Sequence, residues 1–90
     1  MESYGIAAFR SRQAVLRFEE MLRRAGVRAQ VITTPRAVSL GCGLSVRFEI
    51  ADAGSVMQVL QKTRPGNLIG LYQVDRRGGG RPKLTVLARM

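Results

Sequence analysis

The chain joins two similar halves through the stretch Pro35-Arg36-Ala37-Val38-Ser39-Leu40-Gly41-Cys42-Gly43-Leu44. Each half reads as a strand, a helix and a second strand, so this stretch decides how the halves meet. It holds the only cysteine of the chain, placed between two glycines. Glycine tolerates a positive φ and lets the backbone approach a ligand closely. We therefore expect a loop here that carries the chemistry of the protein.

The first half predicts a strand, a helix and a second strand. Residues Tyr4 to Phe9 form an apolar run, which is typical of a central strand buried on both faces. A helix is predicted after Ser11, a candidate N-cap, because apolar residues then recur at spacings of three and four up to Gly26. Gly26 favours a left-handed stop. Residues Val27 to Thr33 are rich in β-branched side chains and end before Pro35, which indicates a strand.

The second half repeats this pattern. Residues Leu44 to Ile50 alternate between apolar and polar side chains, as a half-buried strand does. Asp52 is a candidate cap for a second helix ending near Thr63, before the turn residues Pro65-Gly66-Asn67. Leu68 to Val74 reads as the fourth strand. The doubled order predicts an α+β fold, the ferredoxin-like βαββαβ sandwich, with a four-stranded antiparallel sheet in the order 4-1-3-2 and two helices on one face.

The length of 90 residues indicates one domain, which we expect to cover residues 1–74. Residues 75–90 form a short C-terminal extension. Its first part, Asp75 to Pro82, is rich in glycine and arginine and reads as a flexible basic linker. Its second part, Lys83 to Arg89, is predicted either to add an edge strand to the sheet or to serve a partner.

Composition restricts the function further. With one cysteine and no histidine, the chain offers neither a disulfide nor the usual zinc ligands, so we expect no metal and no cofactor. A free thiol suits a reducing compartment, and the sequence shows no signal peptide and no apolar run of the ~20 residues that span a membrane. We therefore expect a cytoplasmic protein that does not bind membranes.

The chain is strongly basic, with 15 basic residues, 6 acidic residues and a net charge of +9. Such a balance favours encounter with nucleic acid or with an acidic protein partner. The arginines are spread along the chain, however, so solvated surface charge without a specific partner explains the composition equally well.

The predicted topology brings Cys42 to the start of the first helix. A helix N-terminus carries about half a positive charge, which stabilises a thiolate and would make the cysteine reactive. Backbone N–H groups at glycines and nearby guanidinium groups would add to this effect. The alternative is a small, half-buried apolar residue in a tight turn. The residues expected to support the thiolate are Arg10, Ser11, Arg12, Arg36, Gly41 and Gly43.

The spacing Pro35-Arg36-x-x-Ser39-x-x-Cys42-Gly43-Leu44 resembles the small putative selenium/sulfur carrier protein-like family, a bacterial domain of unknown function. Phe9 and Ser11 before the first helix, and Arg47-Phe48 in the third strand, add to the resemblance. It covers roughly residues 4–74. The resemblance implies a role in sulfur or selenium metabolism, in which Cys42 holds the atom as a persulfide or selenosulfide. It also implies that Arg36 and Ser39 shape the loop and that a protein donates or receives the atom.

Three functions remain open at this point. A carrier needs no general base, and the sequence offers neither a cysteine–histidine pair nor paired carboxylates near the loop, so catalytic turnover is not expected. An interaction or regulatory domain would act through a sheet edge, including as a homodimer. A nucleic-acid-binding module would need exposed aromatic side chains on the sheet. The aromatic residues are Tyr4, Phe9, Phe18, Phe48 and Tyr72, of which Phe18 and Phe48 are expected in the core.

Overall fold

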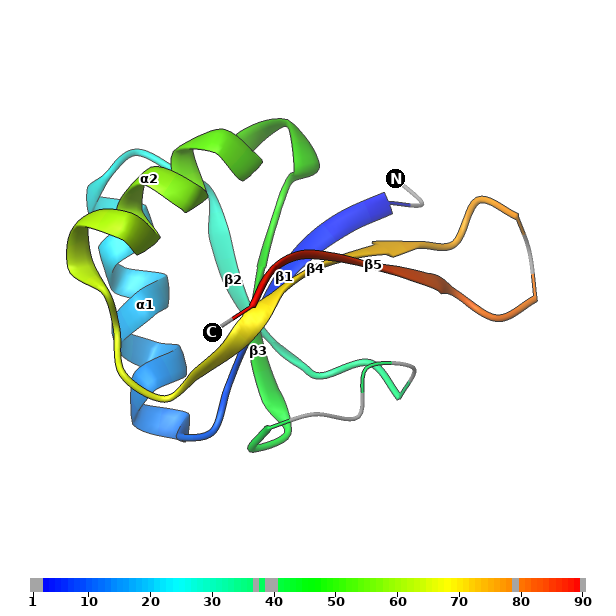
Figure 1. The fold of residues 1–90 in the computed structure, drawn as a ribbon, viewed down its shortest axis with the longest axis horizontal. Helices are drawn as coiled ribbons and strands as arrows, with labels where there is room; N and C mark the ends of the chain where they lie inside the picture. The colour runs from blue at the N-terminus through cyan, green and yellow to red at the C-terminus, as the bar shows by residue number, and fades with distance from the viewer. Residues whose placement is uncertain (1–2, 37, 39–40, 79, 90) are drawn as a thin grey trace.

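The computed structural model describes residues 3–36, 38, 41–78 and 80–89, and it shows a sheet with two helices packed on one face (Figure 1). The strands are hydrogen-bonded in the order β2-β3-β1-β4-β5, and every neighbouring pair is antiparallel. The elements are β1 (Ser3–Phe9), α1 (Arg12–Arg24), β2 (Ala29–Thr33), β3 (Leu44–Phe48), the 3₁₀ turn η1 (Ile50–Asp52), α2 (Ala53–Thr63), β4 (Leu68–Asp75) and β5 (Lys83–Arg89).

The predicted α+β class is confirmed, and the first four strands have the predicted order. The prediction of a four-stranded sheet is wrong, because β5 pairs with β4 from Asp75 opposite Lys83 to Gly70 opposite Arg89. The segment expected to be a linker is the connection of this hairpin. Arg77 anchors it with hydrogen bonds to both carboxylate oxygens of Asp75, at 2.8 to 3.0 Å. Local pairing across a short connection makes β5 the natural neighbour of β4.

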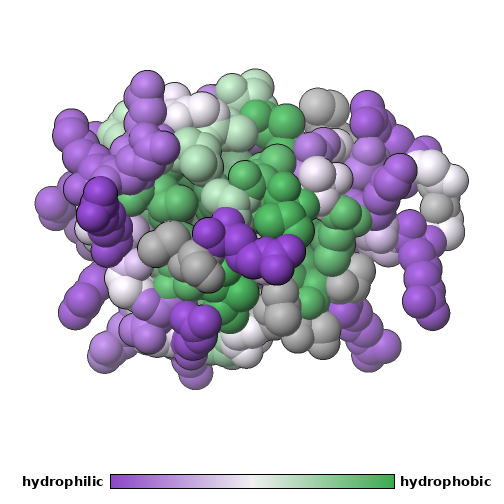
Figure 2. Space-filling model, viewed as in Figure 1, coloured by the Kyte–Doolittle hydropathy of each residue, from purple (hydrophilic) through white to green (hydrophobic). Residues whose placement is uncertain are grey.

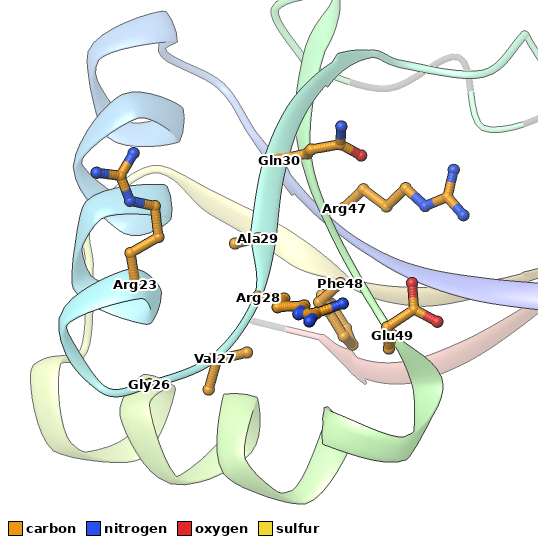
Figure 3. A pocket seen from close by; sticks show the side chains of 9 residues that line it. All are labelled: Arg23, Gly26, Val27, Arg28, Ala29, Gln30, Arg47, Phe48 and Glu49. Carbon is orange, nitrogen blue, oxygen red and sulfur yellow. The ribbon is translucent and has the colours of Figure 1, made fainter.

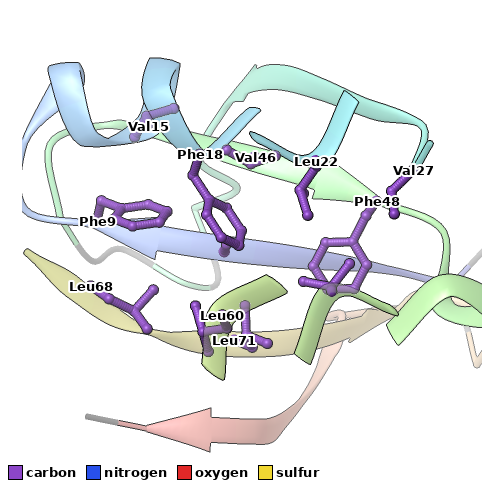
Figure 4. Close-up of a cluster of buried hydrophobic side chains, with 12 residues drawn as sticks. Phe9, Val15, Phe18, Leu22, Val27, Val46, Phe48, Leu60, Leu68 and Leu71 are labelled. Carbon is purple, nitrogen blue, oxygen red and sulfur yellow. The ribbon is translucent and has the colours of Figure 1, made fainter. Parts of the chain in front are cut away.

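The main core lies between the sheet and the helices (Figure 4). Helix α1 begins at the N-cap Ser11, whose hydroxyl accepts a hydrogen bond from the Ala14 backbone N–H at 3.3 Å. Its apolar face then buries Phe18 against the ring of Phe9, with 5.3 Å between ring centroids. The side chains drawn and labelled in Figure 4 are Phe9, Val15, Phe18, Leu22, Val27, Val46, Phe48, Leu60, Leu68 and Leu71.

Helix α2 begins differently from the prediction. Asp52 occupies the N-cap position, but its side chain makes no capping hydrogen bond. Its backbone has φ −95° and ψ 5°, which is not the extended conformation that an N-cap side chain requires. Instead the backbone N–H of Asp52 donates to the carbonyl of Glu49 at 2.9 Å, so the 3₁₀ turn leads the chain into the helix. The helix ends at Thr63, as predicted, and Arg64 follows in the left-handed region.

The sheet face opposite the helices, here called the open face, carries a second apolar cluster. Alternate residues of β1 point to it, and Tyr72 and Val74 of β4 join them. Val38 of the loop between β2 and β3 also packs into this cluster and is only 5% exposed. The guanidinium of Arg47 lies 4.3 Å from the ring centroid of Tyr4. The loop and an arginine therefore cover part of the open face.

Candidate functional site

The loop that contains Cys42 is held by backbone hydrogen bonds at two points. At its base the N–H of Thr34 donates to the carbonyl of Gly43 at 2.9 Å. The N–H of Cys42 donates to the carbonyl of Phe9, the last residue of β1, at 3.1 Å. Phe9 stands two residues before the N-cap of α1. The backbone of Cys42 is therefore fixed at the end of the sheet where β1 stops and α1 begins.

The two glycines beside Cys42 serve this attachment in different ways. Gly41 has φ +80°, and a Cβ atom there would overlap the carbonyl oxygen of Phe9. Gly43 has φ +92°, but open space surrounds the position of its missing Cβ. Gly41 is thus required by both conformation and close approach, whereas Gly43 is required by conformation alone.

The thiol of Cys42 is half-buried and packs against the edge of the main core. Its Sγ lies 3.7 Å from the carbonyl oxygen of Leu44, within reach of a weak S–H hydrogen bond. The residue is therefore partly exposed, and its neighbours on the core side are apolar.

Two of the residues expected to support a thiolate have other partners. The backbone N–H of Arg10 donates to the carbonyl of Asn67 at 2.8 Å, and its guanidinium donates to the carbonyl of Leu68 at 3.3 Å. Arg10 is thereby anchored towards β4. The hydroxyl of Ser11 accepts from the helix backbone as the N-cap. Arg12, the first residue of α1, is exposed and completes the positive end of the helix.

Arg36 lies near the C-terminal hairpin. It lines a shallow pocket of about 570 Å³ together with Arg81, Pro82 and Leu84 of that hairpin. No local pattern in the sequence signals this proximity, because it depends on the position of β5 in the sheet. Ser39, the remaining candidate, lies outside the described residues.

A larger hollow of about 660 Å³ lies at the opposite end of β3 from Cys42, and Figure 3 shows the residues that line it. It includes Arg23, Arg28 and Arg47, which suggests anion binding at first sight. Arg47 lies over Tyr4 on the open face, however, whereas Arg23 projects from α1 on the other side and pairs with Glu19 at 3.3 Å. The guanidinium groups therefore do not converge on one ligand.

Within residues 3–36, 38, 41–78 and 80–89, no group of three histidine, cysteine, aspartate or glutamate side chains lies close enough to hold a metal ion. No helix in this part of the chain has the length and apolar character needed to cross a bilayer.

Fold and site together define a small α+β domain with a single cysteine. This cysteine is partly exposed, lies between two glycines and is held at the end of β1. A family model described as "Putative Se/S carrier protein-like" matches residues 4–68. The match covers more than two thirds of the chain, and the chain therefore belongs to this family. It includes the whole loop around Cys42 and ends at the first residue of β4, so β5 lies beyond it. Searches of curated proteins and of solved structures gave no significant match.

Proposed function

We propose that this protein carries sulfur or selenium on Cys42 and transfers it between protein partners, on a ferredoxin-like sandwich extended by β5. The observation that carries the proposal is the placement of the only cysteine. Cys42 is half-exposed, held by its backbone to Phe9, and lies inside the region that matches the carrier family.

The transfer chemistry requires only a thiolate. The sulfur of Cys42 attacks the outer sulfur of a persulfide on the donor protein, and a new S–S bond forms as the donor's S–S bond breaks. The donor leaves as a thiolate, and Cys42 becomes a persulfide. The same exchange with an acceptor thiol returns Cys42 to its starting state. Neither half of the cycle consumes an oxidant, and neither needs a histidine.

The surroundings of Cys42 support this reaction through charge. The positive end of α1 begins two residues after the carbonyl that holds the cysteine, and Arg12 adds a full charge at the same end. Positive potential stabilises a thiolate relative to a thiol. The apolar neighbours on the core side limit access by water, which protects a persulfide from loss while it is carried.

The test is the intact mass of the protein after incubation with a cysteine desulfurase and cysteine. We expect the wild type to gain the mass of one or more sulfur atoms, and a reductant to remove the gain. Cys42→Ser, run beside it, should gain nothing. Absence of an adduct under conditions that load an established sulfur carrier would contradict the proposal and leave Cys42 as a turn residue.

Nucleic-acid binding by base stacking has less support than transfer. Stacking requires exposed aromatic rings, and all five aromatic side chains of the chain are at most 7% exposed. The two tyrosines that point to the open face, Tyr4 and Tyr72, belong to its buried apolar cluster. Basic side chains could still contact phosphates, but nothing on the described sheet surface offers a platform for bases.

A further inference from the structure

Strand β5 is an edge strand with an apolar surface. One side of it pairs with β4, and no described strand pairs with the other. Among the described residues four large hydrophobic side chains are exposed, and three of them, Leu84, Val86 and Leu87, lie on β5. Figure 2 shows apolar side chains gathered over this part of the molecule, with hydrophilic ones projecting around them. Such an edge is a template for another strand.

The edge has a basic end. Arg36 and Arg81 line the pocket beside Leu84, and Lys83 is the first residue of β5. The ion pairs of the described residues join Arg23 to Glu19, Arg24 to Glu20 and Arg77 to Asp75, so none of them uses these three cations. The pocket combines two guanidinium groups with the apolar surfaces of Pro82 and Leu84. It fits a carboxylate that lies next to an apolar side chain.

We infer that β5 and this pocket form a docking site for an extended segment of an acidic partner protein. The partner segment adds a strand along the regular part of β5, Lys83 to Val86, before the register shift at Leu87. Its alternate apolar side chains cover Leu84 and Val86, and its carboxylates meet Arg36 and Arg81. The site is independent of sulfur transfer on Cys42, although Arg36 belongs to the loop that carries the cysteine.

A second copy of the chain fits this edge less well. A second copy paired along the regular part of β5 would bring its own Lys83 and its own basic pocket to an edge that already carries Arg36, Arg81 and Lys83. It would offer cations, and no carboxylate, to these groups. Among the described residues, β5 contains no acidic side chain to compensate. The charge pattern therefore selects an acidic partner.

The opposite edge of the sheet, β2, does not share these features. Its described residues include no large exposed hydrophobic side chain. The loop that follows it turns towards the open face, where Val38 is buried. Of the strands that the structure describes, β5 alone combines an unpaired backbone edge, exposed apolar side chains and a cluster of cations.

The experiment uses the full chain and a fluorescein-labelled peptide of about eight residues, in which valine and threonine alternate between glutamates at both ends. Fluorescence anisotropy measures binding, and amide chemical shifts locate it. We expect saturable binding that weakens with salt, and shifts confined to β5, its hairpin and the neighbourhood of Arg36. Replacing the glutamates with lysines, or inserting prolines at alternate positions, should abolish binding.

Matched variants test the apolar and the charged parts of the site separately. Val86→Lys should weaken binding about tenfold by placing a charge on the edge, whereas Leu16→Lys, the same change on an exposed residue of α1, should have no effect. Arg36→Glu combined with Arg81→Glu should weaken binding at least about tenfold. Its control, Arg17→Glu with Arg28→Glu, has the same net charge and should bind normally. Cys42→Ser should also bind normally, which separates this inference from sulfur transfer.

Four results would overturn the inference. The first is no binding of the acidic peptide, and the second is equal binding of the lysine peptide. The third is self-association of the chain that Val86→Lys removes, since the occupant would then be a second copy. The fourth is tighter binding of an oligo-thymidine strand than of the acidic peptide at the same residues, which would assign the surface to nucleic acid.

Discussion

The backbone at Gly41 meets two requirements that no residue type other than glycine satisfies together. It adopts φ +80°, and it passes so close to the carbonyl oxygen of Phe9 that a Cβ has no room. The adjacent N–H of Cys42 can then donate to that same carbonyl. The positive φ of the glycines on either side of the only cysteine could be predicted from the sequence, because a loop that returns to a strand end needs such conformations. The atom that Gly41 approaches, the carbonyl oxygen of Phe9, could not be predicted from the sequence.

Gly41→Ala should lower the free energy of unfolding by about 2–4 kcal/mol, since it introduces both a strained φ and a clash with backbone. Gly54→Ala is the matched control. Gly54 lies in the first turn of α2 with open space around it, so alanine there should raise stability by roughly 0.5 kcal/mol. Urea denaturation of both variants measures the two effects. Equal stability of the two would show that the attachment at Gly41 is not needed for folding.

Other residues show where prediction from the sequence stops. Asp52 was expected to cap α2 with its side chain, but a 3₁₀ turn stabilised by backbone bonding precedes the helix. Arg36 is expected to support a thiolate at Cys42, and it lines a pocket with residues of the C-terminal hairpin. The two findings differ in origin. At Asp52 the local backbone conformation prevents the side chain from capping, whereas the surroundings of Arg36 depend on segments distant in sequence.

At the scale of elements, the C-terminal hairpin departs most from expectation. A run rich in glycine and arginine suggested a flexible linker, yet it connects two paired strands. The decisive contact is the one between Arg77 and Asp75, where the guanidinium and the backbone N–H both bond the carboxylate. The positions of helix α1 and strand β1, in contrast, could be predicted closely from their apolar residues. Helix α1 buries its apolar face and β1 is buried on both faces, as the pattern predicts.

The hairpin gives a prediction for pH. Hydrogen bonds from the Arg77 side chain and backbone lower the pKa of Asp75 to about 2, from an ordinary value of 3.8. Because the folded pKa is depressed, the contact contributes to stability above about pH 4, and the contribution is lost as the pH falls towards 2. Arg77→Ala should return the pKa of Asp75 towards 3.8. Carboxyl-carbon NMR titration of both proteins measures it, and an unchanged midpoint would contradict the assignment.

At the scale of the whole molecule, β5 extends the sheet beyond the region that matches the family. The family match ends at the start of β4, whereas β5 extends the sheet beyond β4 and brings Leu84 next to the loop residue Arg36. The class of fold and the order of the first four strands could be predicted from the repeated pattern of strand and helix. The fifth strand could not be placed, because a short apolar run can pair with the sheet or with a partner.

Removing residues 76–90 should leave a folded but less stable protein. The truncation exposes the edge of β4 and uncovers Tyr72 and Val74, which lie opposite Val86 and Leu84. We expect the free energy of unfolding to fall by roughly 2–3 kcal/mol, with the cooperative transition retained. Thermal unfolding followed by circular dichroism makes the comparison. An identical melting temperature would mean that β5 contributes nothing to the sheet.

The proposed function requires Cys42 to react as a nucleophile at neutral pH. The most direct measurement is the rate of alkylation of Cys42 by iodoacetamide at neutral pH, in the folded protein and in the same protein unfolded in urea. If the positive end of α1 stabilises the thiolate, the folded protein reacts faster than the unfolded chain, and the advantage shrinks with salt. Slower reaction in the folded protein would contradict the claim, and it would assign Cys42 to packing at the edge of the core.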